Sequence, residues 1–94
     1  MSFDIFYSVK ELRWSVEKNG QLLKERSVSF EQLVGARFIG IEKHPLKPHQ
    51  KLMLFEFRRY VWVIPYVEAE TFYFLKTAFP SRKHTKQYLK GVPR

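Results

Sequence analysis

Residues Lys51 to Val67, KLMLFEFRRYVWVIPYV, decide the fold of this 94-residue chain. The stretch contains two runs of aromatic and β-branched residues, 51–58 and 60–67, which meet at the charged pair Arg58-Arg59. Such residues pack well on a pleated surface, and two runs joined by a short polar turn are typical of a β-hairpin. We interpret Arg58-Arg59 as the solvated turn of that hairpin.

Two further runs of the same kind flank the hairpin, at residues 38–43 and 71–77. Short polar connections join the four runs, a pattern that predicts an antiparallel meander. Pro65 has no amide hydrogen to donate, so its strand is predicted to be edge-like or bulged at that point. The segment 44–50, HPLKPHQ, is predicted to be an irregular loop.

Helix signals lie before the strands. Residues 3–7 and 11–14 are expected to be extended, and Ser15 is a candidate N-cap for a short amphipathic helix over 16–26. Ser29 and Gln32 have the S-x-x-Q spacing of a capping box, in which each side chain satisfies a free backbone donor of the other residue. This spacing predicts a second short helix that ends near residues 35–37.

A third helix, capped by Ser81, is predicted at the end of the chain over 81–90. Helices on both sides of a run of strands indicate a single α+β domain. The sequence has no cysteine, which excludes a disulfide framework and Cys-based zinc sites and suits a reducing cytosol.

Neither a secretory signal nor a membrane span is readable in the sequence. Asp4 lies inside the first apolar stretch, which no cationic region precedes. The longest apolar run, 60–67, is far shorter than the roughly 20 residues of a membrane-spanning helix. We therefore expect a soluble, cytoplasmic protein.

The positive charge is concentrated towards the C-terminal end. The formal net charge is +8, and Glu70 is the last acidic residue. Six Lys and Arg residues follow Glu70. Residues 1–70 contain eleven Lys and Arg residues and nine Asp and Glu residues. This asymmetry is typical of proteins that bind a polyanion. Nucleic acid is the favoured partner, although an acidic protein or an anionic membrane would also fit.

Arg82 and Lys83 fall in the first turn of the predicted last helix, where the macrodipole makes cations mildly unfavourable. Free backbone donors and two cationic side chains would converge there on a phosphate. The alternative is a helix that begins near Thr85, with both residues in a solvated loop. Lys76 interrupts an apolar strand, so it either reaches water at the strand end or marks a polar cleft.

His44 and His49 lie in the loop 44–50 without a carboxylate or cysteine beside them, so the pattern does not favour a metal site. A titrating role is the better interpretation for a histidine here, although a surface histidine next to proline often has no role. Paired carboxylates, a Gly-rich phosphate loop and a nucleophile elbow are all lacking. We expect no cofactor.

Two stretches of the sequence form a pattern that recurs in one protein family. The first comprises Trp14-Ser15-Val16-Glu17-Lys18-Asn19, Leu23-Lys24-Glu25-Arg26 and Val28-Ser29-Phe30-Glu31; the second is Ser81-Arg82-Lys83-His84-Thr85-Lys86, followed by Tyr88. Together they resemble the BrnT family of type II toxins. The chain departs from the family at His84, where a small residue is usual, and Lys76 lies near the place of a family arginine. Ser81 also directly precedes Arg82, unlike the serine of the family motif.

The resemblance implies a RelE-like fold: two N-terminal helices packed on a small antiparallel β-sheet, with a C-terminal basic helix. It also implies a ribonuclease toxin that cuts RNA, either free or on the ribosome, and so inhibits translation. The implied partner is a cognate DNA-binding antitoxin, which neutralises the toxin and represses their shared operon. Operator DNA would be reached only through that antitoxin.

The implied cleavage needs no metal, because the ribose 2′-hydroxyl attacks the adjacent phosphorus. Arg82, at the motif arginine, is the candidate for stabilising the transition-state charge, since its planar fork binds two phosphate oxygens. Lys76 and Lys51 would share that role or act as acid, and His44 would act as base or acid. The predicted RNA-binding residues are Lys83, Lys86, Lys90 and Arg58. Trp62, Tyr66 and Tyr73 would stack bases only if their face is open, with core packing as the default.

Two alternatives stay open. The positive surface could dock RNA or an acidic partner without cleavage, or the protein could be an inactive toxin relic that completes an operator-binding complex. Binding by charge alone would weaken smoothly with salt and would survive Arg82→Lys, whereas catalysis would not.

Overall fold

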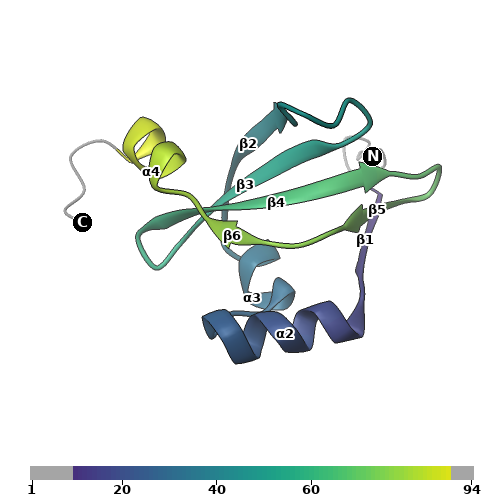
Figure 1. The fold of residues 1–94 in the computed structure, drawn as a ribbon, viewed down its shortest axis with the longest axis horizontal. Helices are drawn as coiled ribbons and strands as arrows, with labels where there is room; N and C mark the ends of the chain where they lie inside the picture. Colours follow the sequence, from purple (N-terminus) through teal and green to yellow (C-terminus); the bar gives the residue numbers. More distant parts are fainter. Residues whose placement is uncertain (1–9, 90–94) are drawn as a thin grey trace, which may run out of the picture.

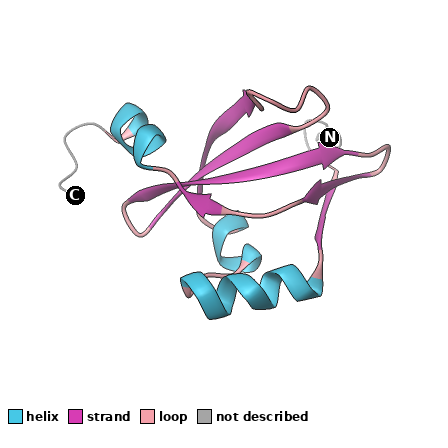
Figure 2. Cartoon of the chain, viewed as in Figure 1, coloured by secondary structure: helices cyan, strands magenta, loops and turns pink. Residues whose placement is uncertain are grey.

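The computed structural model describes residues 10–89. Over this range the chain forms three helices and a six-stranded mixed sheet, so the predicted α+β class is confirmed (Figures 1 and 2). The order is β1 (Glu11–Trp14), α2 (Val16–Arg26), α3 (Phe30–Val34), β2 (Arg37–Lys43), β3 (Lys51–Phe57), β4 (Tyr60–Glu68), β5 (Phe72–Leu75), β6 (Phe79–Pro80) and α4 (Arg82–Tyr88). The predicted segment 3–7 and Lys90 lie outside the described residues.

The capping signals place the first two helices where the sequence predicts them. The Ser15 hydroxyl accepts a hydrogen bond from the backbone N–H of Lys18 at 3.2 Å and so begins α2. Ser29 and Gln32 form both hydrogen bonds of the capping box, at 3.1 and 3.0 Å. Asn19 then ties the two helices together, because its Oδ1 accepts from the N–H of Phe30 at 2.7 Å.

The strands β2, β3, β4 and β5 form the predicted antiparallel meander. The prediction of a wholly antiparallel sheet is wrong, because β1 pairs with β5 in parallel, Glu11 opposite Phe72 and Trp14 opposite Leu75. Helices α2 and α3 and three strands lie between these two elements in the chain. This long connection lets β1 reach the open side of β5 in the same direction, which no hairpin could do.

Strand β4 is central in the sheet, but among residues 10–89 Pro65 has a ladder partner only on the β3 side, so the prediction that the strand is edge-like at that point is confirmed. The strand pairs with β5 through residues 66–68 and with β6 through residues 62–63. Pro65 therefore falls where the neighbour on one side changes, and its carbonyl oxygen accepts from the N–H of Lys76 at 2.8 Å. The missing amide hydrogen costs nothing there, because no ladder residue requires it.

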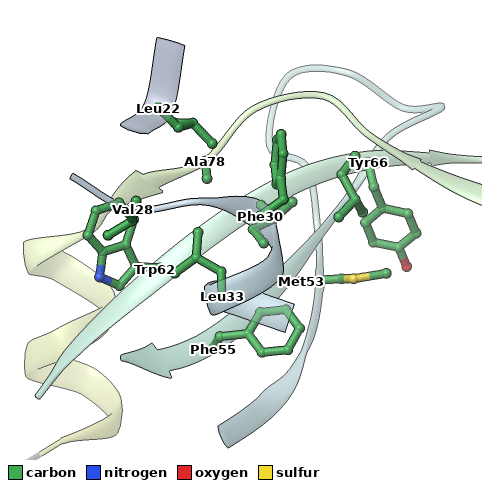
Figure 3. Close-up of a cluster of buried hydrophobic side chains, with 11 residues drawn as sticks. Leu22, Val28, Phe30, Leu33, Met53, Phe55, Trp62, Tyr66 and Ala78 are labelled. Carbon is green, nitrogen blue, oxygen red and sulfur yellow. The ribbon is translucent and has the colours of Figure 1, made fainter. Parts of the chain in front are cut away.

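Helices cover both faces of the sheet. On the face of α2 and α3, the core consists of Leu22, Val28, Phe30, Leu33, Met53, Phe55, Trp62, Ile64, Tyr66, Leu75 and Ala78 (Figure 3). Since Trp62 and Tyr66 are buried there, and Tyr73 packs against them, the default of core packing is confirmed for these aromatic side chains. None of them forms an open stacking surface.

Helix α4 covers part of the other face, where Leu89 packs with Leu52, Leu54, Val61 and Val63. The fully buried hydroxyl of Thr85 accepts from the N–H of Val61 at 2.9 Å and donates to the carbonyl oxygen of Ser81 at 2.7 Å. These bonds fix the helix against β4. No helix within residues 10–89 has the length and apolar character needed to cross a membrane.

Candidate nucleic-acid interface

The loop between β2 and β3 contains a hollow of about 350 Å³. Its lining residues are Lys43, His44, Pro45, Leu46, Pro48, Gln50 and Lys51. Lys43 and Lys51 are partners in the β2–β3 register and close the hairpin, so the loop brings His44 and Lys51 to the same hollow. Three lining residues are basic or imidazole side chains and none is a carboxylate, a composition that favours an anion.

His44 is held in a defined orientation. Its Nδ1 accepts hydrogen bonds from the backbone N–H groups of Leu46 and Lys47, both at 3.1 Å. Because both partners donate, Nδ1 carries the lone pair, and the proton of the neutral ring lies on Nε2. The geometry therefore suits a hydrogen-bond donor to an anion better than the base or acid that the sequence predicts.

The basic residues Arg82, Lys83 and Lys86 lie exposed on α4, and none forms an ion pair with another described residue. Ser81 caps this helix, since its hydroxyl accepts from the N–H of His84 at 3.1 Å. The alternative of a helix that begins near Thr85 is therefore wrong. In Figure 1, α4 lies at the left and the β2–β3 loop at the upper right, so Arg82 is no part of the hollow.

Glu42 connects α4 to β2, and the sequence interpretation missed it. Its Oε1 lies 2.9 Å from His84 Nε2, and its Oε2 accepts from the Tyr88 hydroxyl at 2.6 Å. The hydrogen bond from Tyr88 is the largest cause that lowers the pKa of Glu42, with His84 and Lys83 adding to it against the opposing effect of burial. The spacing of His84 and Tyr88 places them on one helix face, but nothing local identifies their partner on a distant strand.

Ser81, His84 and Glu42 are connected in the order of a hydrolase triad. The Ser81 hydroxyl lies 2.7 Å from His84 Nδ1. That hydroxyl also caps α4, where it accepts from the backbone N–H of His84, and Ser81 does not line the hollow of the β2–β3 loop. We interpret the network as an anchor for α4.

Lys76 lies just after the end of β5 and is exposed, as the strand-end alternative predicts. Its amine lies 5.6 Å from the centre of the Phe74 ring. It lines a second hollow, of about 500 Å³, together with Ser15, Glu17, Lys18, Gln21 and Phe74. The structure therefore does not bring Lys76 together with Lys51, His44 or Arg82 in one hollow.

Arg58 lies in the two-residue turn between β3 and β4, where it and Arg59 have φ values of 56° and 64°. Its guanidinium lies 4.8 Å from the centre of the Phe57 ring and 3.4 Å from the carbonyl oxygen of Ser27, the C-cap of α2. Both arginines are exposed, as expected for a solvated turn. Figure 1 places this turn at the lower left, away from the hollow of the β2–β3 loop.

Comparison with protein-family models, with curated proteins and with solved structures finds no match for this chain. Within residues 10–89, no group of three or more His, Cys, Asp or Glu side chains could hold a metal ion. The functional assignment therefore depends on the charge and geometry of the described surfaces.

Proposed function

We propose that the protein is a ribonuclease toxin of a type II toxin-antitoxin pair, and that it holds an RNA phosphate in the hollow of the β2–β3 loop. The observation that carries this proposal is the convergence of Lys43, His44 and Lys51 on one hollow without a carboxylate. The chain order of two helices, a sheet and the basic α4 is consistent with the RelE-like arrangement that the BrnT resemblance implies. The expected partner is a DNA-binding antitoxin.

Cleavage by the 2′-hydroxyl requires that the negative charge developing on the phosphorane be stabilised. Lys43 and Lys51 supply positive charge at the hollow, and the Nε2–H of His44 can donate to a phosphate oxygen. A lysine ammonium can give its proton to the leaving oxygen. Outside the hollow, the exposed residues Arg82, Lys83 and Lys86 on α4 would bind the phosphates of the RNA backbone.

RNA binding without cleavage is the second candidate function, and one observation favours it. The ring nitrogen of His44 that the loop backbone does not bond, Nε2, is a donor, and no lining residue other than lysine could take the proton of the 2′-hydroxyl. Induction of the protein without an antitoxin separates the two functions. Growth arrest with cleaved RNA supports the toxin, whereas RNA binding without arrest or cleavage supports the binding module.

Lys51→Ala is expected to weaken binding of a single-stranded RNA about fivefold, which corresponds to roughly 1 kcal/mol for one exposed charge contact. The slope of log affinity against log salt should fall in magnitude by about 0.7, the value for one phosphate contact on a single strand. Fluorescence anisotropy at several salt concentrations measures both quantities. Lys47→Ala is the matched control, because Lys47 lies in the same loop but does not line the hollow. An equal loss in both variants would show that the hollow has no special role.

Arg82→Ala is expected to weaken RNA binding by about threefold to fivefold, as for one backbone contact, and Arg82→Lys should retain most of the affinity. The reason is that Arg82 lies on α4 and outside the hollow. Anisotropy and a single-turnover cleavage assay together check this. If Arg82→Ala and Arg82→Lys both abolished cleavage but left binding unchanged, the scissile phosphate would lie at α4 and not in the loop.

A further inference from the structure

Gln50 is a buried polar residue in the wall of the loop hollow. It is 8% exposed and directly precedes β3. Its backbone is fixed, because its N–H donates to the carbonyl oxygen of Lys47 at 3.0 Å and its own carbonyl oxygen accepts from the N–H of His44 at 3.3 Å. The main chain therefore holds this side chain at one place in the hollow.

The side-chain amide of Gln50 has no hydrogen-bond partner among the described residues. Such an amide is costly to bury unless something satisfies it. Within residues 10–89, Trp62 Nε1 is the one fully enclosed side-chain polar atom without a partner. Gln50 keeps 8% of its surface exposed, and the open space beside it is the hollow that it lines. Because Gln50 lines the hollow, its amide can meet a ligand there.

The rest of the wall suits a nucleotide. Pro45, Leu46 and Pro48 are exposed apolar residues, and Leu46 is 83% exposed, so they can contact the flat face of a base. Lys43 and Lys51 lie beside them and can hold the adjoining phosphate. A volume of about 350 Å³ is within the range of small-ligand sites and is enough for one nucleotide.

We propose that this hollow takes one unstacked nucleotide of single-stranded RNA and that Gln50 determines which base it accepts. The inference deepens the proposed function and rests on it. A primary amide presents a donor beside an acceptor, which matches the hydrogen-bonding edge of a base, most commonly adenine. In an A-form duplex the Watson–Crick edges are paired and the major-groove edges lie in a deep, narrow groove, so a duplex cannot enter the hollow in this way.

The test compares short RNA homopolymers of A, C and U, and an A-form duplex of equal length, by fluorescence anisotropy. We expect the wild-type protein to prefer one base, adenine, by about tenfold and to bind the duplex more weakly. In Gln50→Leu this preference should fall below about twofold, while the phosphate contacts keep the mean affinity within about threefold. A preference for another base that Gln50→Leu removes would equally assign base reading to Gln50.

Gln87→Leu is the matched control, because Gln87 is exposed on α4, and its base preference should equal that of the wild type. Circular dichroism establishes that each variant is folded. If Gln50→Leu does not fold, Gln50→Glu keeps the volume and the acceptor but loses the donor, and the same loss of preference is expected. The inference about Gln50 is wrong if the folded variant keeps the base preference, or if the wild type binds all homopolymers and the duplex equally. Neither result contradicts the proposed function. Failure of the wild type to bind any RNA overturns the proposed function.

Discussion

Phe30→Ala is expected to lower the free energy of unfolding by about 3 to 5 kcal/mol, the usual cost of emptying a buried aromatic site. Phe30 is the first residue of α3, and its side chain is 0% exposed. Its ring stacks on Trp14, with a centroid distance of 5.4 Å and an interplanar angle of 28°. The variant leaves a cavity among the buried side chains of the core to which Phe30 belongs (Figure 3).

A domain of this size has a total stability on the order of 5 to 15 kcal/mol, so this loss is a large share of it. Urea unfolding followed by tryptophan fluorescence measures the change. Phe38→Ala is the matched control, since Phe38 is 51% exposed and should cost about 1 kcal/mol. Similar losses in the two variants would mean that Phe30 is not the centre of this core.

The loss at Phe30 should also reach the hollow. Helix α3 contacts β3, and the first residue of β3 is Lys51, which lines the hollow. The core under the sheet therefore holds one end of the loop that presents the cations. The residues that line the hollow nevertheless differ from the residues that fill the core.

The elements that the sequence predicts well depend on signals within a few residues. The hydroxyl of Ser15 reaches the N–H of Lys18, and Ser29 and Gln32 satisfy each other, so each helix start can be read from four consecutive residues. The β3–β4 hairpin is equally local, because Phe57 and Tyr60 pair across a two-residue turn. Such contacts need no knowledge of the remaining chain.

The features that the sequence does not predict depend on distant contacts. The parallel pairing of β1 with β5 and the contact of Glu42 with His84 both join residues far apart in the chain. The charge of Lys51 and the imidazole of His44 identify these residues as candidates, but their meeting in one hollow follows from the hairpin register. Gln50 was missed because an uncharged residue is noticed only when its burial is known.

Glu42→Ala is expected to lower the free energy of unfolding by about 2 kcal/mol, because the variant loses two hydrogen bonds to a charged carboxylate. One comes from the Tyr88 hydroxyl at 2.6 Å, and the other joins His84 Nε2 at 2.9 Å. Helix α4 should loosen first, since these bonds connect it to β2. Glu56→Ala is the matched control: Glu56 pairs with Arg37 at 2.7 Å, and the Arg37 side chain is 63% exposed, so the cost should stay below about 1 kcal/mol.

The pH dependence of the unfolding free energy tests the hydrogen bonds of Glu42 more specifically than the size of the loss in Glu42→Ala. Tyr88 and then His84 lower the pKa of Glu42 in the folded protein below its ordinary value of 4.5. A lowered carboxylate pKa stabilises the folded state above the unfolded pKa, and this contribution is lost as the pH falls through the folded value. The difference in unfolding free energy between wild type and Glu42→Ala should therefore be constant near neutral pH and shrink below about pH 4.5.

At alkaline pH a raised pKa, rather than a lowered one, makes the stability of the folded protein depend on pH. The hydrogen bond to Glu42 raises the pKa of Tyr88 above its ordinary value of 10.0. A raised tyrosine pKa stabilises the folded state below the unfolded pKa, and this contribution is lost as the pH rises through the folded value. The advantage of the wild type over Glu42→Ala should thus decline above about pH 10 as well. Urea unfolding at pH 3, 7 and 10.5 measures both limbs, and a difference that stays the same at all three would show that the ionised carboxylate does not anchor α4.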